Sequence, residues 1–354
     1  MSIFNFTQGR LMARISTLVL ATTIWHADVA QAEIIPLADM LHGTTISAAQ
    51  CAAKRDTVWV TAFNQGFCLR YYVSTAGGDG RRPIVLLSGD KLGPFNRTTG
   101  SFSPAPKDGD VDTINLIKRA DVASQLAGAP AIYLARIGID GSSGFHGVRK
   151  TNLELEAVNA ALNAIKIRYR LDGFHLVGQS GGAGLIGSLL GMRHDVGCAV
   201  LGSGPLYWGK INQPSDPALQ YPDPTNAVPA IAQNRSTRIL VVTDPADQRV
   251  PIERQSTFVR NLREAGGRVE QFFVQSTDPE HHGVVGFASV AAAGCVRGAS
   301  DQVISLKLGA YQQTVLAHAT SVAHATPSGA TPAAPTTGHP QKVTTTRGGR
   351  MGKG

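Results

Sequence analysis

Eight short apolar runs, rich in Val, Ile, Leu and aromatic residues, recur along the chain, and helical patterns separate several of them. Runs of this length and composition are typical of buried strands. Two runs come in direct succession, and the later ones alternate with helices. This order predicts an α/β fold with a doubly wound, mostly parallel sheet that has an antiparallel start and helices on both faces. The predicted strands are residues 57–63, 68–74, 83–90, 131–138, 174–180, 198–204, 238–244 and 269–276.

The clearest helical pattern covers Thr151 to Arg170, where apolar residues recur on one helix face. Thr151 and Glu154 have the spacing of a capping box, which predicts the start of this helix. The segment Pro205 to Arg235 is different, because it is rich in Pro, Asn and Asp and has little helical period. Long irregular segments in compact domains often cover binding sites, so we predict a short irregular lid there. Further helices are predicted over residues 182–192, 252–266 and 284–295.

The N-terminal end has the pattern of a secretory signal peptide. Arg10 and Arg14 precede an apolar run over residues 15–25, and Ala30-Gln31-Ala32 supplies a small-residue cleavage site. The apolar run is short for a membrane span. Residues 1–32 therefore predict an exported protein, periplasmic or secreted, with no stable membrane insertion after cleavage.

The C-terminal end, residues 316–354, is rich in Ala, Thr, Pro and Gly, which predicts a disordered tail and a folded domain over residues 33–315. The net charge of the chain is +8, but this tail carries four cations and no acid. The signal segment adds one net positive charge, which leaves +3 for the folded domain. So weak a charge does not favour nucleic-acid binding, and we expect no nucleic-acid partner.

Four cysteines remain after cleavage, and an even number predicts two disulfides in an exported chain. Three pairings are open, and we favour the one that joins near neighbours and then a late strand with a late helix. There is no C-x-x-C sequence, so no metal site is expected, and no cofactor motif was found. The favoured pairs are Cys51–Cys68 and Cys198–Cys295.

One predicted strand runs directly into a glycine-flanked serine, in the sequence Phe174 to Leu185. A serine in a sharp strand-to-helix turn needs small neighbours, and Gly178 and Gly182 stand two residues before and after Ser180. Such a turn lifts the hydroxyl above the sheet and frees the Gly181 N–H to face an anion. Ser180 is thus a candidate nucleophile, which needs a base and an orienting carboxylate.

Candidate partners follow two later strands. One strand ends in Asp244, with Asp247 three residues further on, and the next ends in a loop that holds His281 and His282. Strand ends at the carboxyl edge of a doubly wound sheet meet in space, so these side chains are expected near Ser180. The order of serine, acid and histidine along the chain suits nucleophilic catalysis.

These motifs together resemble those of α/β-hydrolase fold serine hydrolases, over residues 83 to about 295. The resemblance implies Ser180 as the nucleophile, Asp247 as the acid and one histidine of the pair as the base. The family often has G-x-x-D-x-x-V-P at the acid turn, and here Asp244 stands where the glycine would be. Asp247 matches the acid position of that pattern, and Asp244 is the alternative.

Among the two histidines, the resemblance favours His282, which precedes a glycine, and His281 is the alternative. Neighbouring residues tend to point apart, so the two would not bind one metal together. The oxyanion hole needs a second N–H from the loop after an early strand. Gly89 and Asp90 lie at that place, where the family often has His-Gly. We assign the Asp90 N–H, with Gly89 as the alternative, beside that of Gly181.

The loop from Arg136 to Thr151 follows another strand end and has two interpretations. It is a solvated connection, or its Phe145-His146 pair lines the mouth of the pocket. Arg149 and Lys150 are either polar loop residues or attract an anionic substrate. The candidate pocket residues are Gln179, Phe145, Tyr207 and Trp208.

The function that these residues predict is an exported serine hydrolase acting on a small-molecule ester or acyl substrate. Ser180 would form an acyl-enzyme, His282 would carry the proton, and Asp247 would orient the imidazole. A serine peptidase, an amidase or an acyltransferase could use the same residues. An alternative of another class is a non-catalytic binding protein on a hydrolase-like scaffold.

Overall fold

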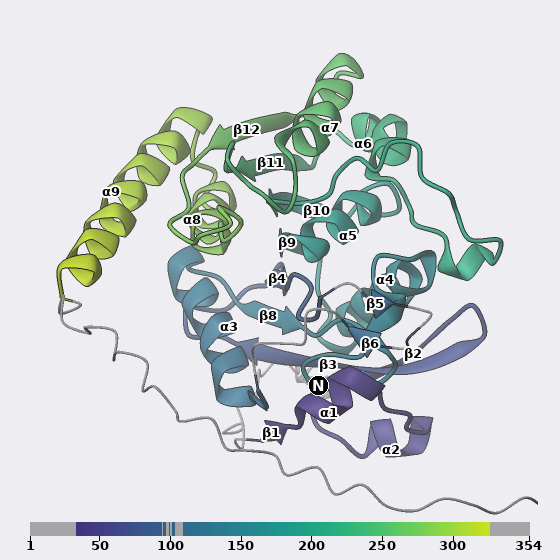
Figure 1. Cartoon of the computed structure of the whole chain (residues 1–354). Helices are drawn as coiled ribbons and strands as arrows, with labels where there is room; N and C mark the ends of the chain where they lie inside the picture. The colour runs from purple at the N-terminus through teal and green to yellow at the C-terminus, as the bar shows by residue number, and fades with distance from the viewer. Residues whose placement is uncertain (1–32, 94, 97–98, 100, 103–108, 326–354) are drawn as a thin grey trace, which may run out of the picture.

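The computed structural model describes residues 33–93, 95–96, 99, 101–102 and 109–325. The predicted signal segment, residues 1–32, and the distal tail, residues 326–354, lie outside this part. A sheet of eight strands forms the centre of the molecule (Figure 1). Its strands, in spatial order, are β12 (Val269–Phe273), β11 (Arg238–Thr243), β10 (Val196–Gly202), β9 (Phe174–Gln179), β4 (Ile84–Leu87), β8 (Ala131–Leu134), β3 (Gln65–Ser74) and β2 (Thr57–Ala62).

The predicted sheet architecture is confirmed. Strands β2 and β3 form an antiparallel hairpin, and β3 also pairs antiparallel with β8. From β8 through β4, β9, β10 and β11 to β12, every pairing is parallel. The carboxyl ends of β9, β11 and β12 therefore lie on one edge of the sheet, where the loops with the predicted catalytic residues begin.

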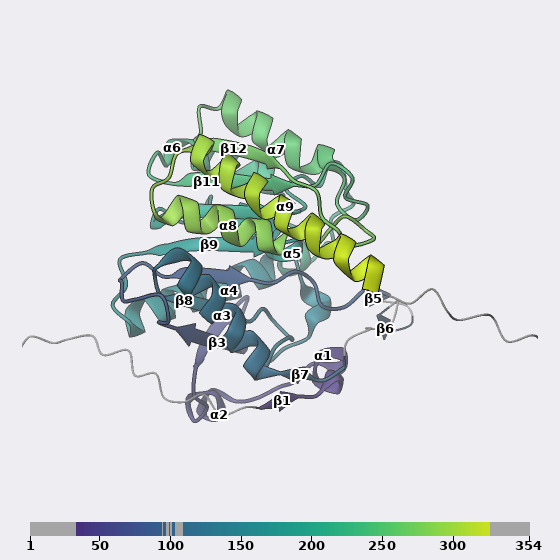
Figure 2. The ribbon, with the colours of Figure 1, turned by 90° about the vertical axis from the view of Figure 1, so that its left-hand side faces the viewer.

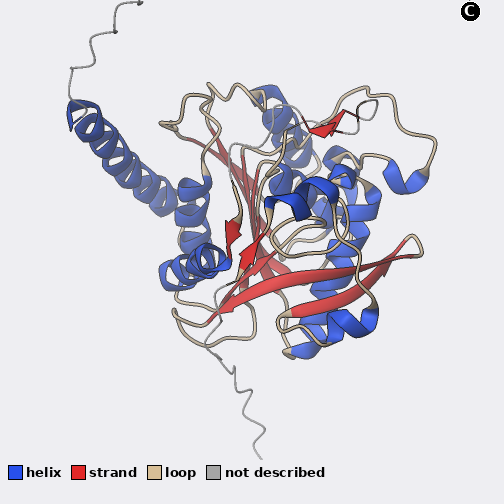
Figure 3. Ribbon diagram, turned by 60° about the horizontal axis from the view of Figure 1, so that its bottom comes forward, coloured by secondary structure: helices blue, strands red, loops and turns tan. Residues whose placement is uncertain are grey.

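Both faces of the sheet are buried, as alternation along its strands shows. In β11, Ile239 and Val241 belong to one core cluster, and Leu240 and Val242 belong to the other. The first cluster lies beneath helices on one face and the second beneath helices on the opposite face (Figures 2 and 3). The first set is α4 (Asn152–Arg168), α5 (Gly181–Leu189), α6 (Val228–Gln233) and α7 (Ile252–Glu264), and the second is α3 (Thr113–Ala127), α8 (Val285–Val296) and α9 (Asp301–Ala325).

The four predicted helices correspond to α4, α5, α7 and α8, with ends that differ by at most three residues. The predicted capping box is wrong. Thr151 is the N-cap of α4, but its side chain makes no capping hydrogen bond, and its hydroxyl donates to Val148 O at 2.6 Å. Glu154 is fully buried and its carboxylate accepts from the Arg136 guanidinium instead. An ion pair inside the protein has replaced the local cap.

The tail boundary also needs correction, because α9 extends to Ala325 and the chain is helical over residues 316–325. The helix docks at its start, where Ile304 and Leu308 are buried in the second core cluster. Ala-rich sequence extends a docked helix at little cost, since propagation is favourable once a helix has begun. Neither α9 nor α3 was predicted from the sequence.

The predicted lid segment, residues 205–235, contains short helical turns and α6. Its Pro205 and Pro224 pack closely on glycines of α5, at Gly184 and Gly187. The segment thus lies along the outer side of α5 and reaches α4 and α7. Its turns are η2 (Pro217–Leu219) and η3 (Pro224–Ala227).

The N-terminal region forms a small layer beside the hairpin β2–β3. A disulfide joins Cys51 in α2 to Cys68 in β3, and a second joins Cys198 in β10 to Cys295 in α8. Both favoured pairings are confirmed. The remaining short elements are β1 (Ile34–Ile35), α1 (Leu37–His42), α2 (Ala48–Ala52), β5 (Phe95–Asn96), β6 (Ser101–Phe102), β7 (Val111–Asp112) and η1 (His146–Val148).

In the described part of the chain, none of the helices has the length and apolar character that crossing a membrane requires.

Candidate active site

Ser180 occupies the turn between β9 and α5, and its backbone has φ 54° and ψ −121°. A positive φ is strained for a residue with a side chain, and such strain gathers at functional positions. The Ser180 N–H donates to Gly202 O of the neighbouring strand at 2.8 Å, which fixes the turn against β10. The Gly181 N–H follows at the first position of the helix, where no earlier helical carbonyl is available to accept it.

The two glycines around this turn are required by space, as predicted. A Cβ on Gly178 would lie 2.6 Å from the backbone nitrogen of Ala183. A Cβ on Gly182 would lie 2.3 Å from Leu87 O, at the end of β4. Both contacts are with backbone atoms, so any larger residue would move the strand or the helix.

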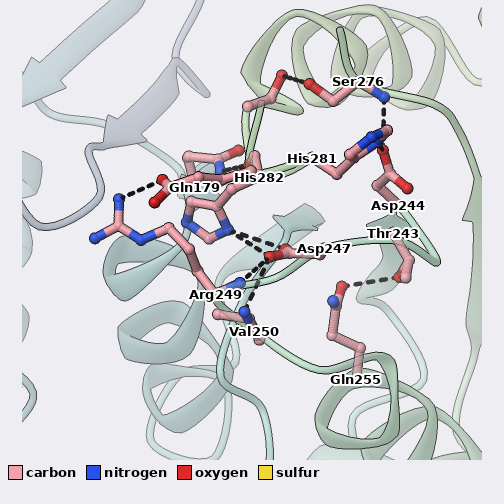
Figure 4. A network of polar contacts seen from close by, with 12 residues as sticks. Gln179, Thr243, Asp244, Asp247, Arg249, Val250, Gln255, Ser276, His281 and His282 are labelled. Carbon is pink, nitrogen blue, oxygen red and sulfur yellow. Dashed lines mark hydrogen bonds and ion pairs between the residues drawn. The ribbon is translucent and has the colours of Figure 1, made fainter. Parts of the chain in front are cut away.

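Asp247 and His282 form a hydrogen-bonded pair at the ends of β11 and β12 (Figure 4). The His282 Nδ1 lies 3.0 and 2.9 Å from the two carboxylate oxygens, and the N–H groups of Arg249 and Val250 also donate to Asp247. Burial alone would raise the Asp247 pKa, but the hydrogen bonds from His282 and the backbone outweigh it and lower that pKa. The carboxylate is therefore ionised and aimed at the imidazole.

The two alternative residues form a second pair. The His281 Nδ1 lies 3.0 Å from Oδ2 of Asp244, and the same oxygen accepts from the N–H of Ser276 (Figure 4). The Oδ1 of Asp244 accepts from the N–H of Ala246. Asp244 thus connects the loop after β11 to the loop after β12. This pair lines a cavity of about 450 Å³ beside Phe273, and Ser180 is not among the lining residues. Its position suits the joining of two loops.

Gln179 connects the serine turn to the histidine loop. It directly precedes Ser180, and its Nε2 donates to the backbone oxygen of His282 at 2.7 Å (Figure 4). Asp278 shapes the same loop by accepting from the N–H groups of His282 and Gly283. Gln179, proposed from the sequence as a pocket residue, therefore holds the histidine loop against the end of β9.

The loop after β4 lies against the serine turn, as the oxyanion assignment requires. A Cβ on Gly89 would come 3.1 Å from the Ser180 Cβ and 3.7 Å from its Oγ. The Asp90 side chain covers the next residue, because a Cβ on Gly181 would lie 2.2 Å from Asp90 Oδ1. Gly89, Asp90 and Gly181 are thus brought together around Ser180.

Three cations surround the Asp90 carboxylate. Arg136 donates to Oδ1 at 3.0 Å, and Arg149 and Lys150 lie 3.2 and 2.6 Å from Oδ2. Burial would raise the Asp90 pKa, but Lys150, Arg136 and Arg149 outweigh it and hold that pKa far below its ordinary range. The carboxylate beside the serine turn is therefore permanently ionised.

A buried ion pair supports this carboxylate from behind. Arg136 and Glu154 are both fully buried, and the guanidinium donates to the two Glu154 oxygens at 2.9 and 2.7 Å. Burial alone lowers the Arg136 pKa, but Glu154 and Asp90 raise it above its usual value, so the guanidinium stays charged. Sequence analysis missed this pair. A charged residue within the apolar run predicted over residues 131–138, two positions after the end of β8, was the one available signal.

The other predicted pocket residues are dispersed. Phe145 packs in a small cluster with Leu92 and Phe102 and so has a structural role. Its neighbour His146 is fully buried, with Nδ1 3.0 Å from Ile137 O. At the start of the lid segment, the side chain of Tyr207 is 37 % exposed and that of Trp208 is half-buried. Trp208 lies beside Lys150, near Asp90. The described residues contain no group of three His, Cys, Asp or Glu side chains able to hold a metal ion.

No protein-family model and no curated protein sequence matches the chain. An esterase from Pyrococcus furiosus has a similar structure, with 13% identity, a TM-score of 0.49 and coverage of 72% of this chain and 96% of its own. For Est1E from Butyrivibrio proteoclasticus, the identity is 10%, the TM-score 0.45 and the coverage 69% and 98%. An α/β serine hydrolase homologue from Coxiella burnetii is 15% identical, with a TM-score of 0.44 and coverage of 70% of this chain and 98% of its own.

The strand order and the strand-to-helix turn at Ser180 give the chain an α/β-hydrolase fold.

Proposed function

We propose that the protein is an exported serine hydrolase that cleaves carboxylic esters through an acyl-enzyme. The observation that carries the proposal is the position of the Asp247–His282 pair, held by Gln179 beside the strained turn of Ser180. A scaffold without catalytic activity would need neither the strained serine nor an ionised carboxylate aimed at a histidine. The fold alone does not determine the function, so the argument rests on the site.

In the proposed mechanism, Ser180 Oγ attacks the ester carbonyl carbon while its proton passes to Nε2 of His282. Asp247 holds the imidazole by Nδ1 and stabilises its charged form. Collapse of the tetrahedral intermediate breaks the bond to the alcohol, which leaves with the proton from His282. Water then attacks the acyl-enzyme with the same base, and the carboxylic acid is released.

The negative charge on the tetrahedral oxygen would be stabilised by N–H groups around the serine turn. The Gly181 N–H, at the start of α5, is the first donor, and the Gly89–Asp90 loop supplies the second. Arg136 contributes indirectly, because it donates to Ser88 O at 3.2 Å and to Asp90, and so holds this loop in place. In this role Arg136 is a positioning residue.

Export is part of the proposal. The N-terminal segment has the order of a signal peptide, and the two disulfides suit an oxidising compartment. The test is the N-terminal sequence of the protein recovered from the periplasm or the medium of an expressing bacterium. A start at Glu33 is expected, and retention of residues 1–32 in the cytoplasm would contradict export.

The catalytic proposal is tested with a neutral fluorophosphonate on the purified, disulfide-intact protein, followed by mass spectrometry of the adduct. We expect modification of Ser180, and none in Ser180→Ala. His282→Ala should abolish labelling, whereas the matched variant His281→Ala should retain it. A folded wild-type protein with an unmodified Ser180 would contradict the proposal. Esters, amides and acyl acceptors tried side by side then distinguish the esterase from a peptidase, an amidase or an acyltransferase.

A further inference from the structure

Two cations lie beside the ring of Trp208. From the centre of its ring, Lys150 Nζ is 5.9 Å away and the guanidinium carbon of Arg254 is 5.6 Å away. The indole N–H donates to Pro222 O at 3.1 Å, and the backbone N–H donates to the Asp223 carboxylate at 3.0 Å. The ring is therefore held in place with both cations beside it.

Lys150 reaches this ring from a loop and Arg254 from the first turn of α7, and both segments follow strands at the edge of the sheet where Ser180 and Asp247 lie. Lys150 lies in the connection after β8, and its Nζ is 2.6 Å from the Asp90 carboxylate beside the serine turn. Arg254 is the third residue of α7, which directly follows the loop that holds Asp247. Trp208 thus bridges the oxyanion side of the site and the acid side.

Arg254 occupies a position that does not favour its charge, and Lys150, whose charge is paired with Asp90, has a strained backbone. Arg254 is half-buried and has no carboxylate partner among the described residues. It also lies in the first turn of α7, where the helix dipole disfavours a positive charge. Lys150 has a left-handed backbone with φ 62°, held by its N–H donating to Glu154 at 2.6 Å. Charges in unfavourable positions are expected where a site needs them.

The ionic contacts near Trp208 leave Arg254 without an ion-pair partner within the described part of the chain. Asp90 is shared by three cations, Glu154 pairs with Arg136, and Asp223 accepts only from N–H and hydroxyl groups of its own segment. Glu253, which precedes Arg254 in the first turn of α7, is exposed. An anionic ligand would therefore be attracted to the unpaired guanidinium of Arg254.

We propose that the substrates are esters that carry a carboxylate at the end remote from the bond to be cleaved, and that Arg254, with Lys150, binds this carboxylate beside Trp208. The inference rests on the proposed function and names its substrate class. It gives the start of the lid segment a role, because Trp208 contacts both cations and would help to hold them beside the anionic group.

The test compares kcat/KM for pairs of esters that differ in one charge. On the acyl side, the mono-4-nitrophenyl ester of suberic acid is compared with 4-nitrophenyl octanoate. On the alcohol side, 4-acetoxybenzoate is compared with 4-acetoxybenzamide. We expect the anionic member of one pair to be preferred by about tenfold or more. The preference should weaken as salt is raised, since partly exposed charges are screened.

Variants assign the preference to Arg254. Arg254→Gln should lower the anionic-to-neutral ratio by about tenfold, mainly through KM, whereas Arg254→Lys should retain most of it. Arg260→Gln removes an exposed arginine from the same helix and should leave the ratio unchanged. A wild-type enzyme that the neutral fluorophosphonate labels at Ser180 but that shows no preference in either pair would overturn the inference alone. So would an unchanged ratio in Arg254→Gln. Failure of labelling would overturn the hydrolase proposal, and this inference with it.

Discussion

Asp247 contacts Nδ1 of His282 with both carboxylate oxygens, at 3.0 and 2.9 Å, while Asp244 contacts His281 with one oxygen at 3.0 Å. The two pairs are neighbours, yet only the first has its histidine bound to Gln179 beside the nucleophile turn. Adjacent loops thus carry two similar hydrogen-bonded pairs with different expected roles.

Asp247→Asn is expected to lower kcat by about 10³- to 10⁴-fold, because a neutral amide cannot stabilise the charged imidazole or hold its tautomer. Asp244→Asn is the matched control. It should lower kcat by about tenfold or less and the free energy of unfolding by about 1–3 kcal/mol, since it weakens the connection between two loops. Ester hydrolysis and urea unfolding measure both effects. The opposite pattern would assign catalysis to Asp244 and His281.

Gly182→Ala is expected to destabilise the protein and impair the nucleophile. Its Cβ would lie 2.3 Å from Leu87 O and 2.6 Å from Ser88 O, at the end of β4 and the start of the oxyanion loop. Forcing these backbone atoms apart should cost about 1–3 kcal/mol. Urea unfolding measures the stability, and the rate of fluorophosphonate labelling measures Ser180.

Gly309→Ala serves as the control for this substitution. Gly309 lies in α9, and a Cβ there would have no heavy atom within 4 Å. The change should leave labelling intact and stabilise the protein by up to about 1 kcal/mol, because alanine favours helix more than glycine does. If both variants behaved alike, close packing around the serine turn would not explain why glycine is needed at Gly182.

The sheet, the glycine-flanked turn of Ser180 and the loops that carry Asp247 and His282 could be predicted because their signals are local. Each buried strand carries its own apolar run, and the strained turn has its own glycines at Gly178 and Gly182. The capping box at Thr151 was wrong because Glu154 has a long-range partner in Arg136, which no spacing along the chain reveals. Pairing between buried charges depends on which strands and helices become neighbours.

Helix α9 was missed for a related reason. Its docking depends on particular contacts. Ile304 and Leu308 are buried, and the ring centres of Tyr311 and Phe287 lie 5.0 Å apart in an edge-to-face contact. Gln312 also forms two hydrogen bonds of 2.7 Å with the backbone of Gln275 after β12. Composition alone does not show a surface on which such a helix can pack. Tertiary contacts therefore determine whether this segment forms a helix.

The buried Arg136–Glu154 pair is expected to support the oxyanion loop as well as the fold. Arg136→Met would leave the Glu154 carboxylate buried without its cationic partner and should cost about 3–5 kcal/mol. The double variant Arg136→Met with Glu154→Leu removes both charges and should recover much of the stability. Activity should not recover in the double variant, since Ser88 O and Asp90 Oδ1 still lack the Arg136 guanidinium. Urea unfolding and ester hydrolysis distinguish the two outcomes, and recovery of activity together with stability would mean that Arg136 does not position the loop.

His146 is expected to make the protein less stable as the pH falls below neutrality. Burial, and next the charge of Arg136, lower the His146 pKa from 6.5 to about 4. Its Nδ1 lies 3.0 Å from Ile137 O, and its Nε2 has no partner in the described part of the chain. The folded protein therefore keeps this ring neutral, because a proton on Nε2 would be buried without an acceptor.

The direction of the effect follows from proton binding. Between pH 6.5 and about 4 the unfolded chain binds a proton at His146 that the folded protein does not, so the free energy of unfolding falls as the pH falls through this window. His175 acts in the same direction, because burial and the charge of Arg82 lower its pKa to about 4 as well.

Asparagine at position 146 can keep a hydrogen-bond donor near the place of Nδ1 but does not titrate. His146→Asn should thus reduce the loss of stability between pH 7 and pH 5 by about 2 kcal/mol, measured by urea unfolding at constant salt. His194→Asn, at an exposed site, controls for the loss of a histidine. An equally steep pH dependence in His146→Asn and the wild type would contradict this role for His146.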